Sequence, residues 1–196
     1  MPMYHEGNRE LQNRFGSAAL ADRLAEKTHR TAFTDADKDF IENCPFFFLA
    51  TADSGAQPDC SFKGGAPGFV RVAGPNLLVF PDYDGNGMFK SLGNIRINPH
   101  VGMLFIGMGE RPRRLRVNGT AQLSYDDPLL AQCPGGQLLV RVTATHIFPN
   151  CPRYIPQMQI IAPSPYVPQA GCAPVEPAWK SFGDFSDVVP KRAPAS

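Results

Sequence analysis

The feature that most constrains the fold is a series of short β-branched and aromatic runs, separated by turn residues, between residues 46 and 148. The first run reads F-F-F-L-A-T-A, and an extended segment resumes at Pro58–Phe62 after D-S-G-A-Q, which predicts a β-hairpin. Further strands are expected at residues 68–73, 76–80, 101–108, 113–124 and 137–148. Short antiparallel strands at this spacing are typical of a small barrel or sandwich.

Helices are expected on either side of these strands. In residues 17–30 alanines and leucines recur at helical intervals, and Ser17 can cap the predicted helix. Residues 34–43 repeat the pattern, with Thr34 as the cap and acidic residues in the first turn. Residues 87–98 carry a third helical pattern, which ends before a proline. Two helices are therefore predicted to precede the sheet, and one to interrupt it.

The length and the distribution of proline suggest three parts. A chain of 196 residues suits one domain with a sizeable core. We predict a helical segment at residues 1–44, a barrel domain at 45–148 and a Pro-rich extension at 149–196. Ten of the 20 prolines lie in that extension, which therefore cannot form a regular sheet. We expect it to pack on the barrel or on a partner subunit, with Trp179 as an anchor.

Charge and cysteine content exclude several classes of protein. The net charge of +1 gives no reason to expect binding to nucleic acid or to an anionic membrane. The polar N-terminus and the lack of any apolar run near ~20 residues predict a cytoplasmic protein. Five cysteines without a C-x-x-C pair indicate reduced thiols, with neither a disulfide framework nor a metal site. Cys44 and Cys60 are expected to be small core residues.

A local excess of basic residues marks a candidate anion site. Six Lys or Arg residues lie between Lys90 and Arg116, against the single acid Glu110. The motif G-N-G-M-F-K-S is no nucleotide P-loop, because Phe89 stands where that loop needs glycine before its lysine. What remains is a loop that ends in a short helix and offers Lys90, the Ser91 hydroxyl and backbone N–H groups to a phosphate monoester. The alternative is a solvated pair of strands with charges facing water.

The order of several segments carries a resemblance. These are F-F-F-L-A-T-A, C-S-F-K-G-G, P-G-F-V-R-V, P-D-Y-D-G-N, K-S-L-G-N-I, N-P-H-V-G-M-L-F and L-R-V-N-G-T-A. Between Phe46 and Leu123 the chain resembles the FMN-binding split-barrel family related to pyridoxamine 5′-phosphate oxidase. The resemblance implies a mainly β fold with flanking helices, a six-stranded antiparallel split β-barrel. It also implies a homodimer with FMN in clefts between the subunits.

The candidate cofactor-binding residues combine that resemblance with the donors and apolar surfaces that the flavin needs. They are Ser61, Phe62, Lys63, Pro81, Asp82, Asn86, Lys90, Ser91, Asn94, Arg114 and Arg116. Asn86 has an alternative role as a turn residue between two glycines. Phe62 has an alternative role as a core residue.

Departures from the family pattern bear on the substrate. The chain has Lys90-Ser91 where the oxidase has Arg-Lys, and it lacks the C-terminal Arg-x-His motif. We therefore do not expect pyridoxamine phosphate as the substrate. The leading hypothesis is an FMN-dependent oxidoreductase that acts on an unknown small molecule with an unknown electron donor, and no catalytic residue is assigned. The alternatives are a non-enzymatic FMN-binding redox sensor or flavin carrier, and a haem protein with His100 or His146 as the axial ligand.

Overall fold

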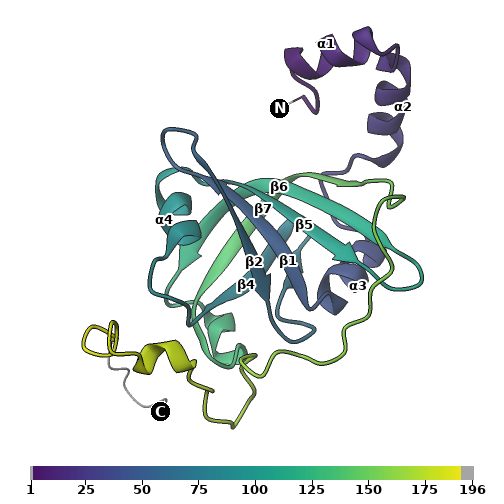
Figure 1. Cartoon of the computed structure of the whole chain (residues 1–196). Helices are drawn as coiled ribbons and strands as arrows, with labels where there is room; N and C mark the ends of the chain where they lie inside the picture. The colour runs from purple at the N-terminus through teal and green to yellow at the C-terminus, as the bar shows by residue number, and fades with distance from the viewer. Residues whose placement is uncertain (1, 191–196) are drawn as a thin grey trace.

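Seven antiparallel strands form one sheet in the computed structural model, which describes residues 2–190 (Figure 1). Their spatial order is β2-β1-β5-β6-β7-β4-β3, so β2 and β3 are the two edges of an open, curved sheet. The strands are β1 (Phe46–Ala52), β2 (Pro58–Gly64), β3 (Arg71–Gly74), β4 (Leu77–Tyr83), β5 (His100–Gly107), β6 (Arg113–Ser124) and β7 (Gly136–Pro149). The mainly β, antiparallel, split architecture is confirmed, with one strand more than the six expected.

The core lies inside the curve of this sheet. Along β1 the buried and outward-facing residues alternate, because successive side chains of a strand point to opposite faces. Phe47 is fully buried and packs against Phe80 and Phe105, with ring centroids 5.0 and 5.3 Å away. Burial of each such ring contributes roughly 1.5–3 kcal/mol to the stability of the fold. The aromatic run that predicts the first strand therefore also anchors the core.

Two elements begin later than the sequence predicts, and residues with positive φ account for both. The strand expected at 68–73 starts at Arg71, because Gly68 has a φ of 88° and belongs to a turn. The helix expected at 87–98 is α4 (Lys90–Ile97). Gly87 and Phe89, with φ values of 77° and 49°, hold the preceding loop in the left-handed region.

Three helices precede the sheet rather than two. They are α1 (Glu6–Arg14), α2 (Ala18–Thr28) and α3 (Asp35–Asn43). The cap of α3 is the predicted one: the Thr34 hydroxyl accepts a hydrogen bond from the Asp37 N–H at 3.1 Å. Neither α1 nor α2 contains a buried residue, and Figure 1 shows both standing away from the barrel. Within residues 2–190 no helix has the length and apolar character needed to cross a membrane.

The Pro-rich extension follows β7 and runs past the barrel to the opposite side of the molecule (Figure 1). It contacts the β5–β6 loop where the Met158 N–H donates to the Met108 carbonyl at 2.8 Å. Two 3₁₀ helices complete the elements of residues 2–190, η1 (Pro128–Gln132) before β7 and η2 (Ala178–Ser181) in the extension. Cys44 is buried as expected. The core assignment of Cys60 is wrong, because this residue is exposed on β2.

Candidate functional site

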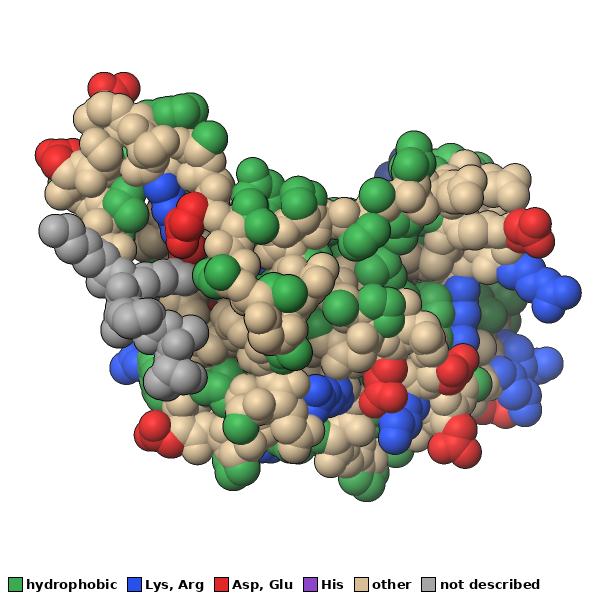
Figure 2. All heavy atoms as spheres, turned by 90° about the horizontal axis from the view of Figure 1, so that it is seen from below, with side chains coloured by type: hydrophobic (Ala, Val, Ile, Leu, Met, Phe, Trp, Pro, Cys, Tyr) green, Lys and Arg blue, Asp and Glu red, His purple; other side chains and the backbone are tan. Residues whose placement is uncertain are grey.

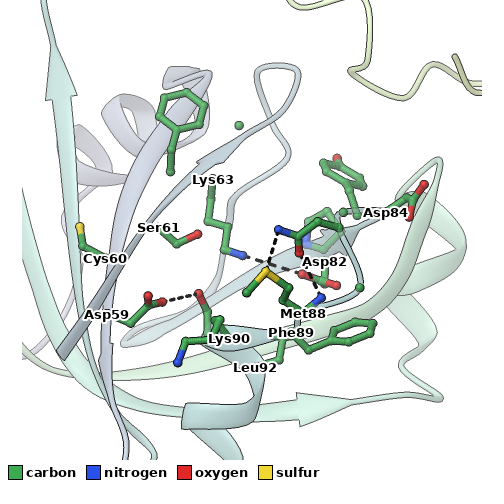
Figure 3. A pocket seen from close by; sticks show the side chains of 18 of the residues that line it. Asp59, Cys60, Ser61, Lys63, Asp82, Asp84, Met88, Phe89, Lys90 and Leu92 are labelled. Carbon is green, nitrogen blue, oxygen red and sulfur yellow. Dashed lines mark hydrogen bonds and ion pairs between the residues drawn. The ribbon is translucent and has the colours of Figure 1, made fainter. Parts of the chain in front are cut away.

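A cavity of about 380 Å³ lies where the edge strand β2 faces the end of β4 and the start of α4 (Figure 3). The structure places eight of the eleven predicted cofactor-binding residues in its lining. They are Ser61, Phe62, Lys63, Pro81, Asp82, Asn86, Lys90 and Ser91. Segments far apart in the sequence thus meet at the split of the sheet, because β2 has no strand neighbour on that side.

The other three predicted residues do not line this cavity. Asn94 lies on the inner side of α4, where its amide donates to the Thr51 hydroxyl at 3.0 Å. Arg114 and Arg116 lie on β6, which β1 and β5 separate from β2. The Arg114 guanidinium donates to the Cys151 carbonyl at 2.7 Å, so it binds the start of the extension. The side chains of Asn94 and Arg114 therefore make other contacts within the chain.

The β2 wall of the cavity carries a lysine that faces an aspartate. Alternate residues of a strand share a face, and this places Asp59, Ser61 and Lys63 together. The Lys63 amino group lies 3.9 Å from the Asp82 carboxylate on β4, and in Figure 3 the two point toward each other. Burial raises the pKa of Asp82 above its ordinary value, while the nearby Lys63 charge opposes the rise. An anionic ligand would compete with Asp82 for this lysine.

The start of α4 forms a second wall. Phe89 precedes the helix in the left-handed conformation, and its side chain makes no capping hydrogen bond. The N–H groups of Lys90, Ser91 and Leu92 precede the first helical hydrogen bond, which the Gly93 N–H donates to the Phe89 carbonyl, and such a helix start favours an anion. The Ser91 hydroxyl lies 3.5 Å from a carboxylate oxygen of Asp59. Both lysines line the cavity, and in Figure 3 the Lys90 side chain extends away from Lys63.

Apolar side chains complete the lining. Phe69 and Leu92 are buried beneath the cavity and give it a fixed floor. Phe62, Met88 and Phe89 are more than half exposed, although each is large and hydrophobic. Phe62 stacks on Phe46 with ring centroids 5.2 Å apart, so it belongs to the outer surface rather than to the core. A planar apolar ligand would shield part of this surface from water.

Several lining residues were not predicted, among them Asp59, Tyr83 and Asp84. Strand alternation is the signal that could have added Asp59, because it lies two residues before Ser61. Burial raises the pKa of Tyr83 to about 12, so its hydroxyl stays protonated. Asn86 accepts a hydrogen bond from the Met88 N–H at 3.0 Å, which is the turn role considered above.

The two histidines considered as haem ligands lie away from this cavity. His146, on β7, shares a hydrogen bond with His29 between ring nitrogens 2.8 Å apart. Burial lowers the pKa of His146, and the neighbouring His29 lowers it further. His100 is exposed at the start of β5. The part of the chain described here has no group of three or more His, Cys, Asp or Glu residues placed to hold a metal ion.

Comparison with known proteins gives a family match and a set of distant structural similarities. The family model described as pyridoxamine 5′-phosphate oxidase matches residues 33–164 of this chain. The search of curated proteins found no match to this chain. The matched region spans α3 and the whole sheet, and it leaves out α1, α2 and the end of the extension.

Among solved structures, HupZ of Group A Streptococcus is 20% identical, with a TM-score of 0.48 over 60% of this chain and 93% of that chain. An FMN-binding protein from Syntrophomonas wolfei is 12% identical, with a TM-score of 0.42 over 72% of this chain and 96% of that chain. The heme storage protein HutZ from Vibrio cholerae is 16% identical, with a TM-score of 0.39 over 55% and 86% of the two chains. Likeness at this level does not identify a ligand.

Proposed function

This chain belongs to the pyridoxamine 5′-phosphate oxidase family, and we propose that it is an FMN-binding flavoprotein that acts as an oxidoreductase on a small molecule. The observation that carries the proposal is the composition of the cavity at the split of the sheet. An uncapped helix start, two lysines and a hydroxyl lie in one lining with an apolar floor. This combination suits a ligand with a phosphate at one end and a flat ring system at the other.

The residues present fit the parts of FMN. Lys90, Ser91 and the free N–H groups of α4 can bind the phosphate, which gains from charge-assisted hydrogen bonds. The floor of Phe69 and Leu92 offers an apolar surface to the ring system. The cavity volume of about 380 Å³ lies within the ~300–1,000 Å³ typical of small-molecule sites.

The protein's part in such chemistry is binding and orientation. When bound, FMN supplies the electron-transfer chemistry, and no acid, base or nucleophile of the protein is required for it. Carboxylates such as Asp82 can accept hydrogen bonds from ribityl hydroxyls and ring N–H groups. Lys63 lies opposite Asp82 and pairs with its carboxylate. This arrangement explains why no catalytic triad or carboxylate pair stands out in the sequence.

A non-enzymatic flavin sensor or carrier is the second candidate. It is favoured by Lys180 of the extension, which binds Asp84 in the lining of the cavity. The extension therefore borders the site on a side from which a substrate could approach. Oxidation of NADH or NADPH in air by the flavin-loaded protein separates the two candidates, because a carrier would not consume the nucleotide.

The flavin proposal is tested by titrating the purified chain with FMN and with riboflavin, which lacks the phosphate. Loss of a charge-assisted phosphate contact costs ~1.5–3 kcal/mol, so riboflavin should bind roughly ten- to a hundredfold more weakly. Fluorescence quenching measures both affinities. Equal affinities would show that the basic residues of the cavity do not bind a phosphate. A haem spectrum from the purified, red protein would show that the cofactor is haem rather than FMN.

A further inference from the structure

The N-terminal arm, which comprises residues 6–29, joins the barrel through a narrow junction. It lies at the end of the barrel opposite the C-terminal part of the extension, which forms the lobe at the left of Figure 2. Helices α1 and α2 of the arm are linked by an ion pair between Arg9 and Asp22, whose atoms lie 2.7 Å apart. Within residues 2–190 neither helix forms a hydrogen bond or an ion pair with the sheet. The polar contacts between arm and barrel therefore occur where the arm ends, beside β7.

A short backbone bridge and a pair of histidines form that junction. Arg30 pairs with Ile147 of β7, and the N–H of each donates to the carbonyl of the other, at 2.9 and 2.8 Å. Beside this bridge, Nε2 of His29 lies 2.8 Å from Nδ1 of His146, and both rings are partly buried. A pairing of two residues is marginal by itself in water. The hydrogen bond between the histidines therefore helps to hold the bridge closed.

The histidine pair has room for only one proton between its facing nitrogens. One ring must donate the hydrogen bond and the other must accept it, whichever tautomer each ring has. Protonation of one ring keeps this bond, because the other ring still accepts. Protonation of both rings puts a hydrogen on each facing nitrogen, removes the acceptor and brings two positive charges together. The doubly protonated pair therefore loses the bond.

The surroundings of the pair oppose its protonation. Burial lowers the pKa of His146, and the charges of His29 and of the amino terminus of the chain lower it further. Strand β6 places the uncharged Asn118 opposite His146. The other charged residues on the segments beside the pair are Glu26, Lys27, Arg30, Asp37 and Arg116. Side chains of these types keep their charge near pH ~6, where histidine titrates, so the imidazoles are the groups whose charge changes there.

We propose that the histidine pair is a pH-sensitive clasp for the N-terminal arm, which opens when the pH falls below about 6. The open state binds one proton more than the closed state, because the closed pair cannot keep both rings protonated. The clasp is therefore closed above the ordinary histidine pKa of ~6.5, and its stabilising effect is lost as the pH falls below that value. Opening separates Arg30 from Ile147, while the Phe33 N–H, which donates to the Pro75 carbonyl at 2.7 Å, keeps the following chain on the barrel.

Hydrogen exchange of single amides, measured by NMR spectroscopy on the full chain at pH 7 and at pH 5, tests this opening. The N–H groups of Arg30 and Ile147 report the bridge directly, and protection factors correct for the pH dependence of intrinsic exchange. We expect their protection factors to fall about tenfold or more from pH 7 to pH 5, because opening takes up a proton. The amides of the β5–β6 ladder should keep theirs. Unchanged protection at Arg30 and Ile147 would overturn the proposal.

Two variants at the same position separate the hydrogen bond from its titration. His29→Gln can still bond to His146, because an amide donates or accepts as required, but the glutamine does not titrate. The bridge should stay protected in this variant and lose its pH dependence. His29→Phe removes the bond, so protection at pH 7 should already be as low as in the wild type at pH 5.

The matched control is His100→Gln, which removes an exposed histidine at the start of β5. This variant should show the same fall in protection as the wild type. The wild-type pH dependence in His29→Gln, or its loss in His100→Gln, would show that a group outside the histidine pair controls the opening.

Discussion

The buried Asp127, at the N-cap of η1, forms an ion pair with the partly buried Arg141 on β7. The guanidinium donates to both carboxylate oxygens, at 2.5 and 3.0 Å, and the Leu129 N–H donates to one of them at 3.0 Å. The aspartate side chain is only 1% exposed. The hydrogen bonds from Arg141 lower the pKa of Asp127 to about 2, and the backbone bond from Leu129 adds to this effect.

The pH dependence of this pair follows from the direction of its shift. Because the folded pKa lies below the ordinary value of 3.8, the pair stabilises the fold fully above pH ~4 and loses this contribution as the pH falls toward 2. Asp127→Asn should lower the free energy of unfolding at pH 7 by about 2–3 kcal/mol. Urea unfolding at pH 7 measures this, with the exposed neighbour Asp126→Asn as the control. Equal loss in both variants would contradict the assignment.

The phosphate end of the proposed flavin site is tested at Lys90. Lys90→Ala should weaken FMN binding roughly ten- to a hundredfold and leave riboflavin binding nearly unchanged, because only FMN carries the phosphate. The control is Arg96→Ala on the same helix, whose side chain binds Tyr125 outside the cavity. Fluorescence titration gives the affinities, and circular dichroism checks the fold. An equal loss for both flavins would indicate damage to the cavity rather than a lost phosphate contact.

Eight of the eleven predicted cofactor-binding residues line one cavity, because they lie in a few short segments of the sequence. Strand β2 and the start of α4 each contributed a contiguous group, which a motif can reveal. The segment K-S-L-G-N-I does not show which side of α4 carries Asn94. In the structure the Asn94 side chain faces Thr51 on β1. Arg114 and Arg116 carry the right charge, yet the strand order places β1 and β5 between them and β2. Charge is visible in a sequence, whereas sheet neighbours are not.

At the scale of elements, the β6–β7 pairing depends on one glycine. The register shifts between Asn118 and Gly119, and a methyl group on Gly119 would lie 2.1 Å from the Thr143 carbonyl oxygen. Gly119→Ala should therefore lower the free energy of unfolding by about 2–4 kcal/mol, since backbone of the central strands must move. Chemical denaturation measures the change. Gly109→Ala is the matched control, because its methyl group meets nothing within 4 Å and it should be nearly neutral.

The elements themselves were largely predictable, and the exceptions have physical reasons. β-branched and aromatic runs mark each strand, because those side chains suit a half-buried pleated surface. Helix α1 was missed because it is polar almost throughout and buries no residue, so it has no apolar periodicity to detect. The starts of β3 and α4 were predicted too early, because the periodicity of apolar residues does not reveal the left-handed backbone conformation at Gly68 and Phe89.

At the scale of the whole molecule, the outer face of β2, β1 and β5 is apolar. Phe48 pairs with Phe62 on one side and with Leu104 on the other, and Phe46 stacks on Phe62. Phe62 is 62% exposed although it also lines the candidate flavin cavity. A contiguous apolar sheet face of this kind is suited to association with a second copy.

We therefore propose a homodimer through this face, with cofactor and interface coupled through Phe62. Phe48→Glu should convert a dimer into a monomer of 21.4 kDa and weaken FMN binding together with it. Light scattering with refractive-index detection measures the mass. Tyr125→Glu, just beyond the end of β6, should leave the mass unchanged. A wild-type chain that is monomeric while holding FMN tightly would contradict the coupling.

The strand order also governs how the chain can fold while it is being made. β7 is the last strand synthesised, yet it lies between β6 and β4. Until Gly136–Pro149 has emerged, the nascent chain contains two β units that no strand pairing joins, β2-β1-β5-β6 and the β3–β4 hairpin. In these units the β6 and β4 edges that pair with β7 in the complete sheet are open. Open edges in incomplete chains favour aggregation. A ribosome that stalls before Gly136 therefore leaves exposed the edges of β6 and β4 that β7 covers in the complete sheet.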